Sequence, residues 1–243
     1  MNHNLIAQVQ NLTLDFKGKT LFHNLNFNIL ENTSSALLGT SGVGKSTLLR
    51  CIADLEAENI TDGKIALKKD TSIAWLSQEN SLYPWLSILD NVQLYHHLKG
   101  TKTNKTLQKA KELLSQVNMS EHVNKKTYEL SGGQKQRVAL ARTLMQDANL
   151  ILMDEPFSAL DAITKIQLQD LTCELLKDKT IVLVTHDPQE AIKLANHIYI
   201  LKNQPVTIEE VAFLEGALPH KLSNEKLWDL QETLLSKLQG DEI

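Results

Sequence analysis

Residues 39–47 read G-T-S-G-V-G-K-S-T and fit the phosphate-loop pattern G-x-x-x-x-G-K-[ST]. Glycines in such a loop permit tight turns that bring backbone N–H groups against phosphate oxygens. The side chain of Lys45 can reach the β- and γ-phosphates, and the hydroxyl of Ser46 can hold Mg²⁺. The motif therefore predicts a nucleoside-triphosphate site with these candidate contacts: Gly39, Thr40, Ser41, Gly42, Val43, Gly44, Lys45, Ser46 and Thr47.

The segments on either side of this loop match the structure that the motif requires. The apolar residues 36–38 predict the end of a buried strand. After the loop, apolar residues recur at helical spacing, at Leu48, Leu49, Ile52 and Ala53. The new helix would add its N-terminal dipole and N–H groups, which favour an anion. A glycine-rich turn with a chance lysine is the alternative, but it explains neither flank.

Two adjacent carboxylates follow the apolar residues 150–153, whose continuous run predicts a central parallel strand buried on both faces. Ligands of open α/β sheets lie at the ends of such strands, and buried carboxylates there are costly unless they are used. Asp154 can hold Mg²⁺ through its water shell. Glu155 can accept a proton from the water that attacks the γ-phosphate. A solvated turn is the alternative for this pair.

Gln78 and His186 each follow another predicted strand, over residues 72–76 and 181–184. The amide of Gln78 could contact Mg²⁺ and the attacking water, although most such glutamines are surface residues. The imidazole of His186 could contact the γ-phosphate. Phe16 ends the first predicted strand; it either stacks on a purine base or is a plain core or edge aromatic, and its spacing does not decide.

A second anion-binding pattern occurs at residues 130–137, which read L-S-G-G-Q-K-Q-R and open a predicted helix. Ser131, Gly132 and Gly133 form a helix start that is chemically similar to the phosphate loop. One γ-phosphate does not need two such helix starts from a single chain. We therefore expect the second one to close over the nucleotide of a partner subunit.

Four further parts of the chain must position these residues. Residues 5–16 and 20–30 predict two antiparallel strands. Between residues 79 and 129 helical periodicity replaces strand-like composition, which predicts a helical insertion in an α/β domain. A last strand is expected at residues 197–201. Residues 224–238 predict a helix that docks on the parent domain or, alternatively, on a second copy, through these leucines: Leu227, Leu230, Leu234, Leu235 and Leu238.

The composition excludes several classes of protein. With 42% hydrophobic residues and 22% charged residues, the chain of 243 residues resembles an ordinary globular protein. The net charge of -4 and the lack of a basic run give no support for nucleic-acid binding. Cys51 and Cys173 lie in predicted helices and are expected to be reduced core thiols. We expect no export signal, and no apolar run approaches the roughly 20 residues that a membrane span needs.

Taken together, the motifs resemble those of the ATP-binding subunits of ABC transporters, over residues 5 to about 201. They occur in the family's order: the phosphate loop, Gln78, L-S-G-G-Q at 130–134, L-I-L-M-D-E-P at 150–156, S-A-L-D at 158–161, and His186. The resemblance implies an α/β fold with a P-loop NTPase (RecA-like) core, an antiparallel β subdomain and an inserted α-helical subdomain. It implies a single domain over residues 1–243, with this division: core and β subdomain 1–78 and 135–205, helical subdomain 79–134, and C-terminal helical tail 206–243.

The resemblance also assigns roles to residues. Two subunits would sandwich two ATP molecules head to tail, and each site would pair one phosphate loop with the partner's L-S-G-G-Q residues Ser131, Gly132, Gly133 and Gln134. Glu155 would be the catalytic base, His186 the γ-phosphate contact and Asp161 a link across the dimer. Phe16 matches the family's adenine-stacking aromatic. The implied cofactors are ATP and Mg²⁺, the metal being held by Ser46, Gln78 and Asp154.

Residues 78–92, Q-E-N-S-L-Y-P-W-L-S-I-L-D-N-V, are similar to the import ATPases of the nitrate, sulfonate, taurine and pyrimidine-precursor (thiamine-related) group. The implied partners are a second, identical ATPase subunit, integral membrane permease subunits that contact residues 78–91, and indirectly a solute-binding protein. The chain would then act peripherally on the cytoplasmic face of the cell membrane. Two departures from the family pattern remove no catalytic group: residues 31–33 replace a glycine-glutamate turn, and the proline common before the signature is absent at residues 128–129.

Other functions share part of this pattern. An ABC exporter ATPase, or a non-transport ABC ATPase of DNA repair or translation, would share the site, but the second type usually carries duplicated cassettes or long coiled-coil insertions. A small-molecule kinase would share only residues 39–47 and leave L-S-G-G-Q unexplained. A catalytically silent binding subunit is disfavoured because every expected catalytic position is filled.

Overall fold

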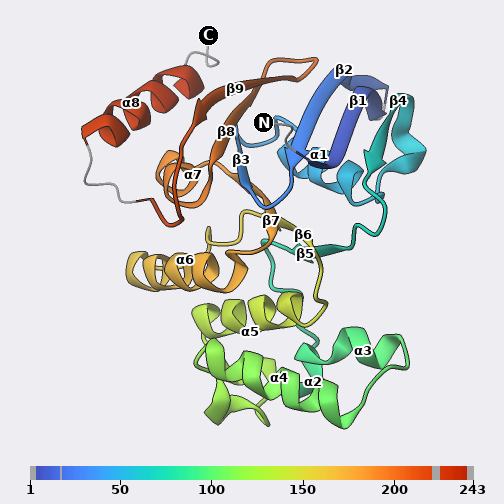
Figure 1. The fold of residues 1–243 in the computed structure, drawn as a ribbon, viewed down its shortest axis with the longest axis vertical. Coiled ribbons are helices and arrows are strands. Elements are labelled where there is room, and N and C mark those ends of the chain that lie inside the picture. The colour runs from blue at the N-terminus through green and yellow to red at the C-terminus, as the bar shows by residue number, and fades with distance from the viewer. Residues whose placement is uncertain (1–3, 17, 221–224, 240–243) are drawn as a thin grey trace.

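The computed structural model describes residues 4–16, 18–220 and 225–239, and its strands form a three-stranded and a six-stranded sheet (Figure 1). The smaller sheet is antiparallel, with the order β2 (Lys19–Leu30), β1 (Leu5–Phe16) and β4 (Ile60–Leu67). In β2 the side chains of Phe27 and Ile29 are buried, whereas the asparagines that alternate with them are exposed. This alternation is typical of a sheet with one face on a core.

The larger sheet has the strand order β5-β6-β7-β3-β8-β9, and its first five strands are parallel. Those strands are β3 (Ser34–Leu38), β5 (Ile73–Leu76), β6 (Leu150–Asp154), β7 (Thr180–Thr185) and β8 (His197–Lys202). All residues of β3 and β7 are buried, as expected for parallel strands covered on both faces. The carboxyl ends of β3, β5, β6 and β7 therefore meet at one edge, where the predicted chemical residues follow.

The sixth strand corrects the expectation of a purely helical tail from residue 206. Residues Thr207–Phe213 form β9, which pairs antiparallel with β8. Its sequence T-I-E-E-V-A-F lacks strict alternation, because two glutamates occupy its centre and the strand is only half-buried. An edge strand needs no continuous apolar run, so the period-2 signal was too weak to predict it.

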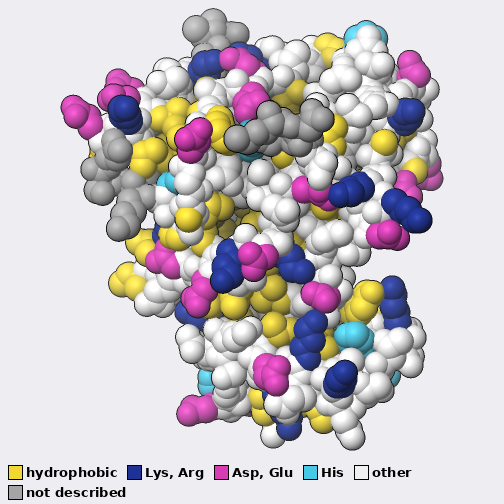
Figure 2. Space-filling model, in the orientation of Figure 1, with side chains coloured by type: hydrophobic (Ala, Val, Ile, Leu, Met, Phe, Trp, Pro, Cys, Tyr) yellow, Lys and Arg dark blue, Asp and Glu magenta, His cyan; other side chains and the backbone are white. Residues whose placement is uncertain are grey.

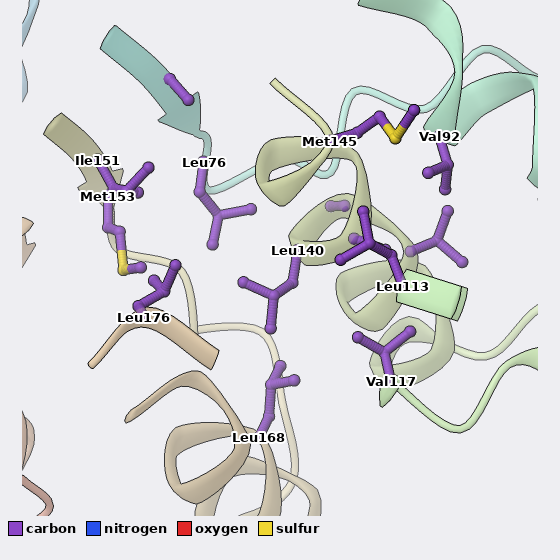
Figure 3. Close-up of a cluster of buried hydrophobic side chains, with 14 of the residues drawn as sticks. Leu76, Val92, Leu113, Val117, Leu140, Met145, Ile151, Met153, Leu168 and Leu176 are labelled. Carbon is purple, nitrogen blue, oxygen red and sulfur yellow. The ribbon is translucent and has the colours of Figure 1, made fainter. Parts of the chain in front are cut away.

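The inserted helices form the lower part of Figure 1. They are α2 (Ile88–Val92), α3 (Leu94–Leu98), α4 (Asn104–Gln116) and α5 (Gly132–Leu144). The buried side chains of α2, α4 and α5 share one cluster with the sheet and with α6 (Ala162–Leu176), as Figure 3 shows for Leu113, Leu140, Met153 and Leu168. The helical insertion therefore has no separate core of its own.

Three helices pack on the sheets at the other end of the molecule. Helix α1 (Lys45–Ile52) buries leucines against the core of the smaller sheet, while α7 (Pro188–Leu194) and α8 (Glu225–Gln239) pack beside β3 and β8. In α8, Leu234 is fully buried, but Leu235 is 40% exposed. The expectation that Leu235 lies on the docking face is therefore wrong, because a 3.6-residue period carries it to the flank of that face.

Both cysteines, Cys51 and Cys173, are buried free thiols, as predicted. Within the described residues, none of the helices has the length and apolar character that a membrane crossing requires.

Candidate functional site

The phosphate loop connects β3 to α1 and folds around its own lysine. The ammonium group of Lys45, which is 5% exposed, donates to the carbonyl oxygens of Gly39 and Thr40 at 2.8 and 2.9 Å. Gly42 and Gly44 have φ values of 81° and 116°, in the left-handed region that favours glycine. Burial lowers the pKa of Lys45, while the carboxylates of the acidic pair after β6 oppose that shift. A buried cation held by loop carbonyls is ready to be transferred to phosphate oxygens.

The two candidate metal ligands on the first helix and on β6 are already in contact. The hydroxyl of Ser46 donates to Oδ1 of Asp154 at 2.7 Å. Burial raises the pKa of Asp154 above its usual value, the Ser46 hydrogen bond opposes this, and the neighbouring Glu155 adds to it. A carboxylate whose charge is disfavoured by burial gains most from a nearby cation. This oxygen donor set suits Mg²⁺, which takes one or two protein ligands and otherwise binds water and phosphate.

The candidate base and the candidate γ-phosphate contact are paired across two strand ends. Nδ1 of His186 lies 3.0 Å from Oε2 of Glu155. The backbone at Glu155 is in the left-handed region, with φ 44°, and its N–H donates to the carbonyl of Val184 at 3.0 Å. A non-glycine residue held there is strained, which is common where a side chain must be aimed at a site. The Glu155 side chain is 17% exposed and that of His186 is 55% exposed.

Ser158 connects this pair to Gln78, a contact that sequence reasoning missed. Its hydroxyl donates to the carbonyl oxygen of Glu155 at 3.0 Å and accepts from the amide Nε2 of Gln78 at 3.3 Å. The structure thus brings Gln78, Glu155 and His186 to one edge of the sheet. The available signal for Ser158 was its place at the start of S-A-L-D, three residues after Glu155.

A cavity of about 460 Å³ joins the phosphate loop to the hairpin of the smaller sheet. Its lining residues include Phe16, Ser41, Lys45, Gln78 and Glu155. Phe16 is 44% exposed, so it is not a core aromatic, and its place at the rim of this cavity favours a role against a base. The lining residues that sequence reasoning missed lie beside Phe16 or follow β8: Lys19, Thr20, Leu21 and Gln204.

The L-S-G-G-Q segment forms a capped helix start at α5. The hydroxyl of Ser131 accepts from the backbone N–H of Gln134 at 3.3 Å, and Oε1 of Gln134 accepts from the backbone N–H of Ser131 at 2.9 Å. This reciprocal capping box satisfies two donors of the helix terminus. The amide Nε2 of Gln134 lies 3.3 Å from Nε2 of His122, so its side chain is engaged within the chain.

Gly133 packs directly against the helix that follows S-A-L-D. A Cβ atom at Gly133 would lie 2.5 Å from Cγ2 of Thr164, whereas a Cβ at Gly132 would meet nothing within 4 Å. Asp161 is the N-cap of α6 and accepts from the backbone N–H of Thr164 at 3.0 Å. The structure therefore places the signature beside the Asp161 segment, and neither lines the cavity at the chain's own phosphate loop.

Comparisons with known proteins agree with this geometry. Residues 22–158 match the family described as ABC transporter. The chain is 52% identical over 240 residues to an uncharacterized ABC transporter ATP-binding protein of Haemophilus influenzae, covering 98% of this chain and 100% of that one. It is 38% identical over 235 residues to the aliphatic sulfonates import ATP-binding protein SsuB 2 of Rhodococcus jostii, covering 96% and 92%.

Among solved structures, the chain resembles the dimeric post-hydrolysis state of the ATP-binding cassette MJ0796 bound to ADP and Pi. The TM-score is 0.74 and the identity 31%, over 86% of this chain and 99% of that one. This likeness confirms the expected fold class.

Proposed function

The chain belongs to the ABC transporter family, whose ATP-binding subunits are ATPases, and from this premise we propose that it powers an importer of small solutes. The solute class that we propose is that of the sulfonate, taurine, nitrate and pyrimidine-precursor importers. A curated relative at 38% identity is named an aliphatic sulfonates import protein, which supports this class. The chain would act on the cytoplasmic face of the membrane, with the permease supplied by other chains and the solute-binding protein contacted only indirectly.

The observation that carries the importer proposal is an exposed aromatic pair next to Gln78. Trp85 is 67% exposed and Tyr83 is 40% exposed, and their rings meet edge to face with centroids 5.1 Å apart. Asn91, which is fully buried, accepts from the backbone N–H of Tyr83 at 2.8 Å and donates to its carbonyl at 3.1 Å. These hydrogen bonds fix the loop with the tryptophan ring exposed to solvent, although a large apolar side chain gains nothing there within the chain. The exposed ring therefore fits a docking surface for the permease.

The same loop is tied to the signature helix by a partly buried cation. The guanidinium of Arg142, on α5, donates to the carbonyl oxygens of Asn80 and Ser81, both at 2.8 Å. Burial lowers the pKa of Arg142 below its usual value. Movement of the permease against residues 78–91 would therefore reach both Gln78 and, through Arg142 in its last turn, helix α5. This connection supports a transport-coupled ATPase over a free-standing one.

For hydrolysis we assign the following roles. Lys45 and the N-terminus of α1 bind the phosphates, and Phe16 stacks on the base. Ser46, Asp154 and Gln78 hold Mg²⁺, which neutralises charge on the phosphates when bound. Glu155 accepts the proton of the attacking water.

In this arrangement His186 contacts two hydrogen-bond acceptors, the carboxylate of Glu155 and a γ-phosphate oxygen. Nδ1 lies against Glu155, so Nε2 is the nitrogen left for the phosphate. Through its two ring nitrogens His186 would therefore orient the base and contact the phosphate together.

A second copy of the chain completes each site in this proposal. The α5 terminus with Ser131, Gly132 and Gly133 would close over the partner's γ-phosphate, and Asp161 would lie at the dimer interface. Both polar atoms of the Gln134 amide are engaged within the chain, Oε1 with Ser131 and Nε2 with His122. We therefore assign Gln134 to shaping the helix start. The charges also fit a protein partner better than nucleic acid, since basic and acidic side chains are interspersed on the face in Figure 2. The predicted boundary of the helical subdomain at residue 134 falls inside α5 (Gly132–Leu144), which packs with α2 and α4, so we assign residues 79–144 to this subdomain.

Copurification tests the proposal. The tagged chain is expressed in its own cell, membranes are solubilised gently, and the eluate is identified by mass spectrometry. We expect an integral membrane permease in the eluate, its loss in Trp85→Ala, and its retention in Trp228→Ala, which removes a tryptophan that is 55% exposed on α8. Recovery of an active ATPase without any membrane partner, alone or on nucleic acid, would refute the importer role.

A further inference from the structure

Lys165 forms two ion pairs that join helix α6 to helix α7. Its Nζ lies 2.6 Å from Oδ2 of Asp187 and 2.7 Å from Oε1 of Glu190. Lys165 lies one turn after Asp161, and its backbone N–H donates to the carbonyl of Asp161 at 2.9 Å. The lysine thus connects the start of α6 to the start of α7, which follows His186 directly.

The contacts continue from Glu190 to both neighbours of His186. Oε2 of Glu190 accepts from the hydroxyl of Thr185 at 2.5 Å, and that hydroxyl accepts from the backbone N–H of Asp187 at 3.1 Å. Glu190 and Thr185 are 3% and 1% exposed. The residues before and after His186 are therefore both fixed by one network that includes Lys165 and is buried at Thr185 and Glu190.

Charge explains why the network needs a lysine at this position. Glu190 is a buried carboxylate, and a buried charge is strongly destabilising without a partner. Burial by itself lowers the pKa of Lys165, but the hydrogen bonds to Asp187 and Glu190 raise it above its usual value. The lysine therefore stays charged and provides a partner for both carboxylates.

Resting on the function proposed above, we infer that Lys165 is a positioning residue that sets the placement of the His186 ring relative to Glu155 and the γ-phosphate. It acts through the backbone on either side of His186 and touches no substrate itself. Because Lys165 lies one turn after Asp161, the position of His186 also depends on the position of the Asp161 segment. A structural brace between α6 and α7 is the competing explanation, and it predicts an effect on stability alone.

A second ion pair between the same two helices provides a matched control. Nζ of Lys193, on α7, lies 2.8 Å from Oδ1 of Asp170 on α6. This pair has the same chemistry but makes none of the contacts to Thr185 or Asp187 described above. Lys193→Met should therefore remove a brace without disturbing the His186 segment.

The experiment compares ATP hydrolysis by purified Lys165→Met, Lys165→Arg and Lys193→Met with that of the unaltered chain. We expect Lys165→Met to lower kcat about tenfold or more with the KM for ATP changed less than about threefold, because the loss concerns orientation in the transition state. Lys165→Arg, which can serve both carboxylates, should keep most of the activity. Lys193→Met should keep kcat within about twofold.

A ring signal reports the position of His186 without any turnover. In protein labelled at histidine, the His186 resonance, assigned by its loss in His186→Gln, should shift in Lys165→Met and not in Lys193→Met. If Lys165→Met unfolds, the double variant Lys165→Met with Glu190→Gln removes the unpaired buried carboxylate and is measured instead. Unchanged kcat and an unchanged ring signal in a folded Lys165 variant would overturn the inference. Absence of ATP hydrolysis in the unaltered chain would instead overturn the proposed function.

Discussion

Gly133 in the signature segment is the position where a single added methyl group should be most informative. A Cβ at this residue would lie 2.5 Å from Cγ2 of Thr164, on the helix that Asp161 caps. Real Cβ atoms do not approach a methyl carbon this closely, so α5 and α6 must move apart or the threonine must change rotamer. The χ1 angle of threonine has few favourable values, which limits relief of the clash by a change of rotamer.

The magnitude follows from the cost of overpacking. Forcing an extra methyl group into a packed contact costs roughly 1–3 kcal/mol. For a domain of 150–250 residues each kcal/mol shifts the thermal midpoint by about 2–4 °C, so Gly133→Ala should unfold roughly 2–12 °C below Gly132→Ala, in which the helix gains an alanine without the clash. Gly132→Ala is the matched control, because its Cβ meets nothing within 4 Å, and alanine favours the helix by up to about 1 kcal/mol.

Circular dichroism on heating measures both variants, and ATP hydrolysis is measured beside it. Adding Thr164→Ser to Gly133→Ala removes the clashing carbon and should restore the thermal midpoint. We expect hydrolysis to stay low in that double variant, because the close approach that we propose between the Gly133 backbone and the partner's phosphate still needs glycine. Equal midpoints for Gly132→Ala and Gly133→Ala, or no rescue by Thr164→Ser, would refute the packing explanation.

Three further predictions concern the phosphate loop and the acidic pair. Lys45→Ala should weaken ATP binding at least tenfold, a loss of about 1.4 kcal/mol, in titration calorimetry, and unchanged affinity would contradict the phosphate-loop assignment. Asp154→Asn should lower hydrolysis by roughly a hundredfold. Without nucleotide at neutral pH, however, this variant should have a slightly higher thermal midpoint than the unaltered protein. The higher midpoint is expected because burial raises the pKa of Asp154, so ionisation of this carboxyl destabilises the fold increasingly as the pH rises through that pKa. A lower midpoint of Asp154→Asn at pH 7 would contradict this explanation. Glu155→Gln should bind ATP normally, lose turnover by roughly a hundredfold or more and accumulate a nucleotide-bound dimer on gel filtration; normal turnover would remove Glu155 from the base role.

The sequence was sufficient for those parts of the fold that local chemistry dictates. A strand, a glycine loop and a helix at residues 34–52 follow from apolar periodicity and from the backbone conformations that glycine permits. Buried strands such as β6 and β7 are continuous apolar runs, so they can also be predicted from the sequence. An edge strand such as β9 is not, because only one of its faces and one of its edges is constrained.

The fine structure of the site depends on contacts that no local pattern encodes. Ser158 meets Gln78 across 80 positions, and Gln134 meets His122 across 12. Such pairs are set by how strands and helices are brought together, so their residue types carry no signal until the topology is known. Leu235 illustrates the same limit on a helix, since leucine composition alone did not show where the docking face of α8 ends.

The shared cluster of Figure 3 bears on how the molecule folds. Leu76 and Met153 of the sheet pack in the same cluster as Val92 and Leu140 of the inserted helices. Melting the insertion would uncover the sheet, so the two parts should lose their protection against hydrogen exchange together, as one cooperative unit. The signature at the start of α5 and the strand end that carries Asp154 should therefore become ordered in the same event, so neither would be folded and exposed without the other.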